Sequence, residues 1–356
     1  MNIEVVRTTS PRPRPEPGKL GFGVHFSDHM FVLEYTADNG WHSPRVEPYG
    51  PLMMDPGASV LHYAQAIFEG LKAFRGAKEQ VNLFRPQQHA ARFHRSAERL
   101  CMPPVPEEVF VEACRKLVAV DESWVPSEDG AALYLRPLTI ATEPFLGVRP
   151  SATYKFIVMT CPVGAYYAEG FNPVRIRVER ERVRAVRGGV GDAKTAGNYA
   201  ASLRAAKEAK AEGYAQVLWT DAATHSYVEE VGTMNVFFKI GGEVITPSLD
   251  GAILPGITRR SVIELLESRG TTVTERRVSL DEVVNAHTDG RLEEAFGTGT
   301  AAVVSPIKTL GVDGKDLTIG NGNVGPMAQS LFDEITGIQR GTREDRFKWM
   351  VSVGDA

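Results

Sequence analysis

Lys194 is the first residue whose surroundings suggest chemistry. It lies in the segment GGVGDAKTAGNYAASL, where glycines and small residues surround it before a helix-like stretch begins. Glycine lets a backbone approach a ligand closely, and a lysine amine that is partly removed from water has a lowered pKa and can attack a carbonyl at neutral pH. The segment alone is equally compatible with a flexible surface loop and a solvated lysine. It matches neither GxGxxG nor GxxxxGK[ST], so it does not predict a dinucleotide or ATP site.

Two adjacent acids, Glu229 and Glu230, interrupt the apolar, strand-like segment VEEVGTMNVFF. Because successive side chains of a strand point to opposite faces, we expect one acid to be exposed and the other to face inward. An inward carboxylate needs a cationic partner. An edge strand with both acids in solvent is the alternative, and this segment does not decide between the two.

Donors for an anion occur in two further segments. In GAILPGITRRSVIELL, a Pro-Gly pair leads directly into a predicted helix, so the first N–H groups, those of Ile257 and Thr258, can bind a phosphate. In FGTGTAAVVSP, a glycine-rich turn carries Thr298 and Thr300. Each feature is common by itself. A combination of phosphate donors, one lysine and one inward acid is more informative than any of these features alone.

These segments carry a resemblance to a known family. GDAKTAGNYAASL, EEVGTMNVFF, ILPGITRRSV and FGTGTA, in this order and spacing, resemble the branched-chain amino acid aminotransferases of the fold-type IV pyridoxal 5′-phosphate (PLP) enzymes. The N-terminal half agrees through DHMFVLEY, LHYAQAIFEGLKAFRG, LFRPQQHAARFHRSAERL, LYLRPLTIATEPFLGV and CPVGAYY, so the resemblance runs from about residue 22 to 335. GTMN and LPG also occur in D-amino acid aminotransferases and aminodeoxychorismate lyases, whereas the long N-terminal motifs favour the branched-chain group.

The resemblance implies roles around the cofactor. Lys194 matches the lysine that forms the Schiff base and then moves the proton of the substrate, as general base and acid. Glu230 matches the acid paired with the pyridinium nitrogen, and Glu229 is expected to face away. Tyr199 matches the tyrosine at the phenolate oxygen, and Leu254 is expected to pack on the ring.

The resemblance also implies how the phosphate is held. Arg92 is expected to contribute its fork of donors. The N–H groups of Ile257 and Thr258 and the residue Thr300 are expected to complete the phosphate site.

The substrate pocket follows in the same way. An apolar side chain would lie among aromatic residues, and the α-carboxylate would bind the N–H groups of Thr300 and Ala301. Arg136 matches the arginine that accepts the distal carboxylate of glutamate, and it shares a strand face with the tyrosine two residues before it. The aromatic residues that match the family are Phe22, Tyr63, Phe68, Tyr134 and Tyr166.

Two further features concern the family pattern. Some members carry a redox CxxC after the GT(A) turn, but Ala302 and Ser305 occupy those positions, so no thiol switch is expected. The loop at residues 145–148 resembles one that reaches the pocket of a neighbouring subunit, which implies a homodimer.

Periodicity and turn residues predict alternating helices and strands. Residues 8–18, with four prolines, are expected to be an extended lead-in. Helices are expected in segments 87–102, 109–125, 201–213, 257–270 and 279–286, and strands or hairpins in segments 30–41, 61–68, 132–142, 154–164, 214–221, 228–240, 272–280 and 293–310.

The predicted fold class is a mixed α/β, two-domain fold-type IV PLP enzyme. We expect a smaller N-terminal α/β domain over residues 1–167 and a linker over residues 168–180. A larger C-terminal PLP-binding domain is expected over residues 181–356, with the cofactor between the two domains.

Composition excludes several classes of protein. With 43% hydrophobic and 24% charged residues, the 356-residue chain is not disordered, collagen-like or a disulfide scaffold. A net charge of −4 without a basic stripe argues against a nucleic-acid binder. No apolar run can span a bilayer and no targeting segment is evident, so we expect a cytoplasmic protein with reduced cysteines. The histidine spacings predict no metal site.

The function implied is reversible amino-group transfer from L-leucine, L-isoleucine or L-valine to 2-oxoglutarate, by a ping-pong route through a PLP Schiff base on Lys194. A D-amino acid aminotransferase or an aminodeoxychorismate lyase is the alternative with the same cofactor. A phosphometabolite-binding protein, with Lys194 only as a counter-ion, is the alternative that is not an enzyme.

Overall fold

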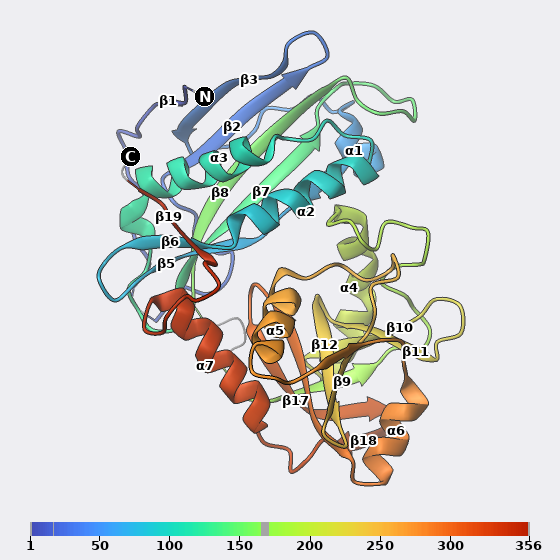
Figure 1. Ribbon diagram of the computed structural model, residues 1–356. Helices are drawn as coiled ribbons and strands as arrows, with labels where there is room; N and C mark the ends of the chain where they lie inside the picture. The colour runs from blue at the N-terminus through green and yellow to red at the C-terminus, as the bar shows by residue number, and fades with distance from the viewer. Residues whose placement is uncertain (1, 17, 165–170, 355–356) are drawn as a thin grey trace. The chain divides into compact units, whose positions relative to one another are not determined.

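The apolar segments of the sequence become two β-sheets in the computed structural model, which describes residues 2–16, 18–164 and 171–354 (Figure 1). Each sheet belongs to its own compact unit. The first unit contains Met1–Tyr166, Ala193–Ala196 and Gly337–Ala356, and the second contains Tyr167–Asp192 and Gly197–Thr336. Among the described residues, no helix combines the length and the apolar character needed to cross a membrane.

The first unit contains a mostly antiparallel sheet in the order β1-β3-β2-β8-β7-β5-β6-β19, with β4 paired to β7. The predicted turn connects β2 and β3 through residues 37–39, and Gly40, at a φ of 61°, begins β3. The strands are β1 Glu4–Val5, β2 His29–Thr36, β3 Gly40–Pro48, β4 Ala66–Phe68, β5 Leu71–Arg75, β6 Val81–Phe84, β7 Ala132–Ala141, β8 Thr153–Val163 and β19 Met350–Ser352.

Two helices, α2 (Pro86–Arg99) and α3 (Glu107–Val120), lie side by side over one face of this sheet (Figure 1). Their apolar faces meet the strands in a core in which Phe93 and Phe110 stack around Phe156 of β8. Burial of each such ring contributes roughly 1.5–3 kcal/mol. The short helices α1 (Ser59–Tyr63) and η1 (Glu122–Trp124) complete the helices of this unit among the described residues.

The second unit contains a sheet that closes on itself. Its order is β14-β13-β12-β16-β17-β9-β10-β11-β15, and the additional pairing of β11 with β12 closes a ring of strands. The strands are β9 Val174–Val178, β10 Gln216–Thr220, β11 Tyr227–Val231, β12 Met234–Ile240, β13 Glu243–Thr246, β14 Val273–Glu275, β15 Val278–Ser279, β16 Leu292–Gly299, β17 Val303–Val312 and β18 Lys315–Thr318. The helices are α4 Ala196–Ala211, α5 Ile257–Glu267, α6 Leu280–Thr288 and α7 Pro326–Arg340.

Most predicted elements are confirmed, and three predictions are wrong. Segment 61–68 is not one strand, because α1 occupies its beginning and only β4 is extended. Segment 272–280 divides into β14 and β15, which pair with different strands. The predicted linker over residues 168–180 contains β9, which pairs with β10 and β17 inside the second sheet.

The predicted domain limits also need correction. The first unit is the larger of the two, because it includes the segment around Lys194 and the last twenty residues of the chain. β19 pairs with β6 of the first sheet, which explains why the C-terminus belongs to that unit. The predicted boundary at 167/168 lies outside the described residues.

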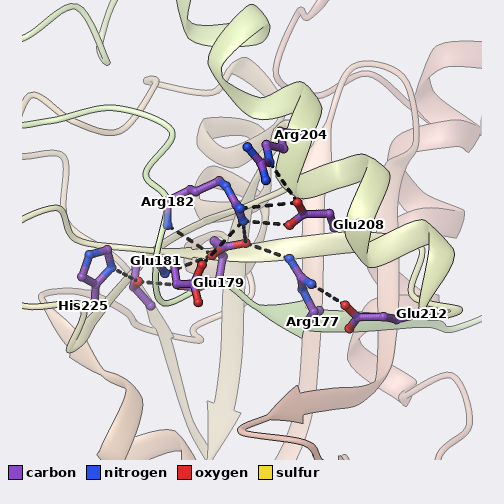
Figure 2. A network of polar contacts seen from close by, with 9 residues as sticks. Arg177, Glu179, Glu181, Arg182, Arg204, Glu208, Glu212 and His225 are labelled. Carbon is purple, nitrogen blue, oxygen red and sulfur yellow. Dashed lines mark hydrogen bonds and ion pairs between the residues drawn. The ribbon is translucent and has the colours of Figure 1, made fainter.

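A network of ion pairs joins β9 to α4 in the second unit (Figure 2). Its centre is Glu179, which is 3% exposed and accepts hydrogen bonds from Arg177 at 2.8 Å and from the main-chain N–H groups of Glu181 and Arg182. Arg182 continues the network to Glu208 of α4 at 2.8 Å. The network therefore fixes the turn after β9 against the helix that carries Tyr199.

We expect Glu179→Ala to lower the free energy of unfolding by about 3 kcal/mol, because it leaves buried donors unpaired. The neighbouring Glu181→Ala is the matched control: its side chain is 82% exposed and its ion pair with Arg182 spans 3.9 Å, so no measurable change is expected. Urea denaturation followed by circular dichroism measures both variants. Equal losses would show that Glu179 is not the centre of the network.

Candidate active site

The main chain of Lys194 is held on both sides within the first unit. Its N–H donates to Ser96 Oγ of α2 at 3.0 Å, and its carbonyl accepts from the N–H of Phe68, the last residue of β4, at 3.0 Å. Thr195 adds a hydrogen bond to the carbonyl of Ala66 at 2.8 Å. Such anchoring is not that of a flexible surface loop. The half-buried Lys194 places Nζ 5.0 Å from the ring centroid of Phe68.

Arg92 lies on the buried face of α2, where it pairs with Glu69. Nε and Nη2 of Arg92 donate to the two carboxylate oxygens of Glu69 at 2.7 and 2.9 Å. His89 Nδ1 lies 2.7 Å from the same carboxylate. All three side chains are almost fully buried. The predicted phosphate residue is therefore part of a rigid charged cluster.

The predicted substrate residues of the first unit form a second group. Phe22 and Tyr134 make an edge-on contact with their ring centroids 5.1 Å apart. Arg136 donates to the Tyr134 hydroxyl at 3.1 Å, and its guanidinium lies 4.7 Å from the ring centroid of Phe68. A Cβ at Gly70 would lie 1.9 Å from the Tyr134 hydroxyl oxygen, so this glycine makes room for the tyrosine.

Two predicted aromatic residues are placed differently. Tyr63 lies at the end of α1 with 41% of its surface exposed, and its hydroxyl donates to the carbonyl of Leu146 rather than joining the Phe22–Tyr134 group. Tyr166 lies outside the described residues. The structure therefore groups Phe22, Phe68 and Tyr134 of the five predicted aromatic residues.

Glu230 is buried in the second unit and surrounded by donors. One of its carboxylate oxygens accepts from the N–H of Leu254 at 2.8 Å and from Asn235 Nδ2 at 3.4 Å. The other lies 2.8 Å from Nε of Arg184, which is itself 8% exposed. The cationic partner expected for an inward acid is thus Arg184. The edge-strand alternative with both acids in solvent is excluded.

A small hollow opens beside this carboxylate. Three residues predicted to contact the cofactor, Tyr199, Glu230 and Leu254, meet there within the second unit. The hollow is lined by Arg184, Asn198, Tyr199, Ser202, Glu230, Gly232, Thr233 and Leu254.

The first turn of α5 is available to an anion. Gly256 precedes the helix, and within the described residues no side-chain cap hydrogen bond is found at the first N–H groups, which belong to Ile257 and Thr258. A Cβ on Gly256 would lie 1.9 Å from Asn235 Oδ1, so the absence of a side chain at Gly256 leaves room for the Asn235 side chain. Asn235 Nδ2 also donates to the carbonyl of Leu254 at 2.9 Å. The acid and the helix start are therefore joined through one asparagine.

Thr298 is a third polar residue beside Glu230 and Asn235 on neighbouring strands. Asn235 pairs with Glu230 on β11 and with Thr298 on β16, so the three side chains share one face. The Thr298 hydroxyl is buried and has no hydrogen-bond partner among the described residues. Thr300 and Ala301 follow in the turn between β16 and β17.

Glu229 differs from the prediction that one of the two acids is exposed. It is only 6% exposed, and one of its carboxylate oxygens has no hydrogen-bond partner in the described part of the chain. Burial, together with the negative charge of Asp250, raises the pKa of Glu229 to about 7, although Arg184 opposes the shift. Side-chain alternation turns it away from Glu230, but the opposite face of the strand is covered.

Comparison with known proteins identifies the family. The sequence model of amino-transferase class IV matches residues 66–310. Over 351 residues the chain is 54% identical to "Branched-chain-amino-acid aminotransferase 2" of Bacillus subtilis, and the match covers 99% of this chain and 97% of the relative. The chain belongs to the class IV aminotransferases.

Solved structures agree with this family. The branched-chain amino acid aminotransferase of Escherichia coli superimposes with a TM-score of 0.78 at 27% identity, covering 92% of this chain and 99% of the other. The branched-chain amino acid aminotransferase of Thermobaculum terrenum, solved in its PLP form, superimposes with a TM-score of 0.74 at 25% identity, covering 91% of this chain and 98% of the other. The predicted fold class, a mixed α/β class IV aminotransferase, is confirmed.

The structure also identifies residues of this aminotransferase that the sequence did not single out. Arg184 is one of many arginines in its region, and no spacing distinguishes it as buried. Asn235 and Glu69 lie inside the quoted motifs EEVGTMNVFF and FEGLKAFRG, so their motifs were found but not their roles. For His89 the sequence indicates no role, because the histidine spacings predict no metal site.

The buried Glu229 makes the stability of the aminotransferase depend on pH. Its pKa is about 7 in the folded protein and about 4.3 in an unfolded chain, so the unfolded chain loses the proton first. The native state is therefore penalised increasingly as pH rises from about 4 to about 7. Glu229→Gln cannot ionise, and we expect it to gain about 1 to 3 kcal/mol relative to wild type between about pH 5 and pH 8.

The control for this prediction is Glu293→Gln. A hydrogen bond from Lys239 lowers the pKa of Glu293, so that acid stays ionised over the same range in both states. Its stability difference from wild type is expected to stay constant with pH. Chemical denaturation at several pH values measures both variants. A difference for Glu229→Gln that does not change with pH would contradict the assignment.

Proposed function

We propose that this class IV aminotransferase is a PLP-dependent branched-chain amino acid transaminase. It would transfer the amino group of L-leucine, L-isoleucine or L-valine to 2-oxoglutarate and back. The observation that carries the proposal is the buried carboxylate of Glu230, set beside Tyr199 and Leu254, which forms an ion pair with Arg184 and accepts hydrogen bonds from Leu254 and Asn235. The full-length relatives named as branched-chain aminotransferases support the substrate class.

The donor set suits a pyridine ring that carries a phosphate. A fixed carboxylate can keep a ring nitrogen protonated, and an uncapped helix start can bind a phosphate. The buried Thr298 hydroxyl, which has no hydrogen-bond partner in the part of the chain that the structure describes, is a further donor on the same sheet face as Glu230. We assign Glu230 to the ring nitrogen, Tyr199 to the phenolate oxygen, Leu254 to the ring face, and Arg92, Ile257, Thr258 and Thr300 to the phosphate.

Bound PLP supplies an electron sink for the pair left when the substrate loses its Cα proton. In our proposal, Lys194 binds the cofactor covalently and afterwards moves the proton as general base and acid. Its two main-chain hydrogen bonds fix the position of the Lys194 backbone, which restricts the positions available to the side-chain amine. Glu230 holds the compensating negative charge, which the surrounding donors keep in one orientation.

The substrate assignments use the Phe22, Phe68 and Tyr134 group for the apolar side chain, with Tyr63 and Tyr166 as further lining. The N–H groups of Thr300 and Ala301 would bind the α-carboxylate. Arg136 would accept the distal carboxylate of glutamate, and its bond to the Tyr134 hydroxyl sets its direction. The aromatic group and Arg136, which belong to the same unit, would then accept both an apolar and an acidic side chain.

We also propose a cytoplasmic homodimer. Large apolar side chains are exposed around α1 and the loop after β7, with Leu146 at 65% and Val148 at 86%. Tyr63 binds this loop through the carbonyl of Leu146, so helix and loop present one surface. Contiguous exposed apolar surface of this kind is typical of an interface, and the loop matches the one that reaches a neighbouring pocket in the family.

A two-substrate assay on the purified protein tests the proposal. We expect the visible absorption of bound PLP and transfer from L-leucine to 2-oxoglutarate, with little activity on D-alanine. Activity on D-alanine without activity on L-leucine would contradict the branched-chain assignment. A colourless protein that stays inactive when PLP is added would contradict the enzyme itself.

A further inference from the structure

We infer that Glu69 is a positioning residue that orients the Arg92 guanidinium for the phosphate of the cofactor. This inference rests on the proposed role of Arg92. It adds a residue from the β4–β5 connection that does not itself contact the cofactor in our assignment. Three features of the Glu69–Arg92 pair support it: its geometry, its burial and its separation from the bonds that hold Lys194.

The pairing geometry leaves the guanidinium one orientation. Nε and Nη2 lie on one edge of the planar group, and they reach the two carboxylate oxygens of Glu69 at 2.7 and 2.9 Å. Two parallel bonds fix both the direction and the plane of an arginine side chain. Nη1 lies on the other edge and therefore also has a fixed position. A single bond would leave rotation about it possible.

Glu69 is itself immobilised. The side chain is fully buried, and its Oε2 also lies 2.7 Å from His89 Nδ1 and accepts from the N–H of Gly70 at 3.1 Å. Burial by itself would raise the pKa of Glu69, but Arg92 and His89 outweigh it and lower the pKa below its usual value. Burial lowers the pKa of His89, and although Glu69 opposes this shift, Arg92 and Lys194 add to the lowering. The cluster is thus one anion, one cation and a neutral imidazole.

The same helix face holds Lys194 through a different residue. His89, Arg92 and Ser96 follow one another at helical spacing and are all buried. Ser96 accepts from the Lys194 N–H, whereas the carboxylate of Glu69 makes no hydrogen bond to Lys194 among those found in the described residues. Loss of the Glu69 charge should therefore disturb the phosphate contact and leave the lysine in place.

A purely structural ion pair is the alternative. Removing it would loosen the whole first unit and weaken every ligand equally. An orienting role instead predicts a loss confined to ligands that carry the phosphate. Pyridoxal, which lacks the phosphate but retains the ring and the aldehyde, separates these two cases.

The experiment measures dissociation constants of PLP and of pyridoxal for the full-length protein freed of cofactor, by absorbance titration. The affinity for PLP divided by the affinity for pyridoxal gives a ratio that measures the contribution of the phosphate contact. We expect Glu69→Gln to reduce this ratio about tenfold or more, because a charge-assisted pair is lost. The affinity for pyridoxal is expected to change less than about threefold. An equal loss for both ligands would overturn the inference.

Ser96→Ala is the matched control on the same helix face. It removes the acceptor for the Lys194 N–H, so it should weaken PLP and pyridoxal together and leave their ratio unchanged. A fall in the ratio as large as that of Glu69→Gln would show that the ratio reports general packing, and would overturn the inference.

Arg92→Lys separates this inference from the proposed function. If Arg92 binds the phosphate, Arg92→Lys lowers the ratio, and adding Glu69→Gln lowers it little further because both act through one contact. An unchanged ratio in Arg92→Lys would contradict the proposed role of Arg92. A lowered ratio in Arg92→Lys with a normal ratio in Glu69→Gln would contradict only the role of Glu69.

His89→Leu covers the case in which Glu69→Gln does not fold. It removes one donor to Glu69 and keeps both bonds from Arg92. We expect a smaller fall in the ratio, about threefold, with a native circular dichroism spectrum. A folded His89→Leu protein with the wild-type ratio would then count against the orienting role.

Discussion

A carboxylate stays charged inside a protein only where a cation and hydrogen-bond donors compensate its lost hydration, and this condition is met by one buried acid in each unit. In the first unit Glu69 meets Arg92, His89 and a main-chain N–H. In the second unit Glu230 meets Arg184, Asn235 and a main-chain N–H. Each acid thereby fixes the groups around it.

Glu229 shows what happens where the condition is not met. It lies on the same strand as Glu230 and is similarly buried. One of its carboxylate oxygens, however, has no hydrogen-bond partner among the described residues, and its pKa rises to about 7. Two neighbouring acids thus take different roles because strand alternation gives them different surroundings. Only the donors distinguish the acid assigned to the cofactor from its neighbour.

Much of the fold could be predicted from local patterns. Apolar spacing predicts helix α2, and the segment 279–286 predicts a short helix that is α6, where Ser279 accepts from the N–H of Glu282. The hairpin-like segment 228–240 predicts β11 and β12. Elements that depend on distant partners could not. The pairing of β19 with β6 assigns the C-terminus to the first unit, and no local signal in either strand indicates it.

The candidate site divides in the same way. Resemblance to the family located Lys194, Glu230 and Arg92, because their motifs are long and specific. Their supporting partners are set by the tertiary fold, because the pairs of Glu69 with Arg92 and of Arg184 with Glu230 join residues 23 and 46 positions apart. A sequence with many surface arginines does not show which of them is buried beside an acid.

The ¹⁵N NMR signal of PLP labelled at its ring nitrogen tests most directly whether Glu230 provides the negative charge for the cofactor. Wild-type protein is expected to show the chemical shift of a protonated pyridinium, and Glu230→Gln that of a neutral pyridine. A neutral nitrogen in the wild type, or a protonated one that persists in the variant, would contradict the account.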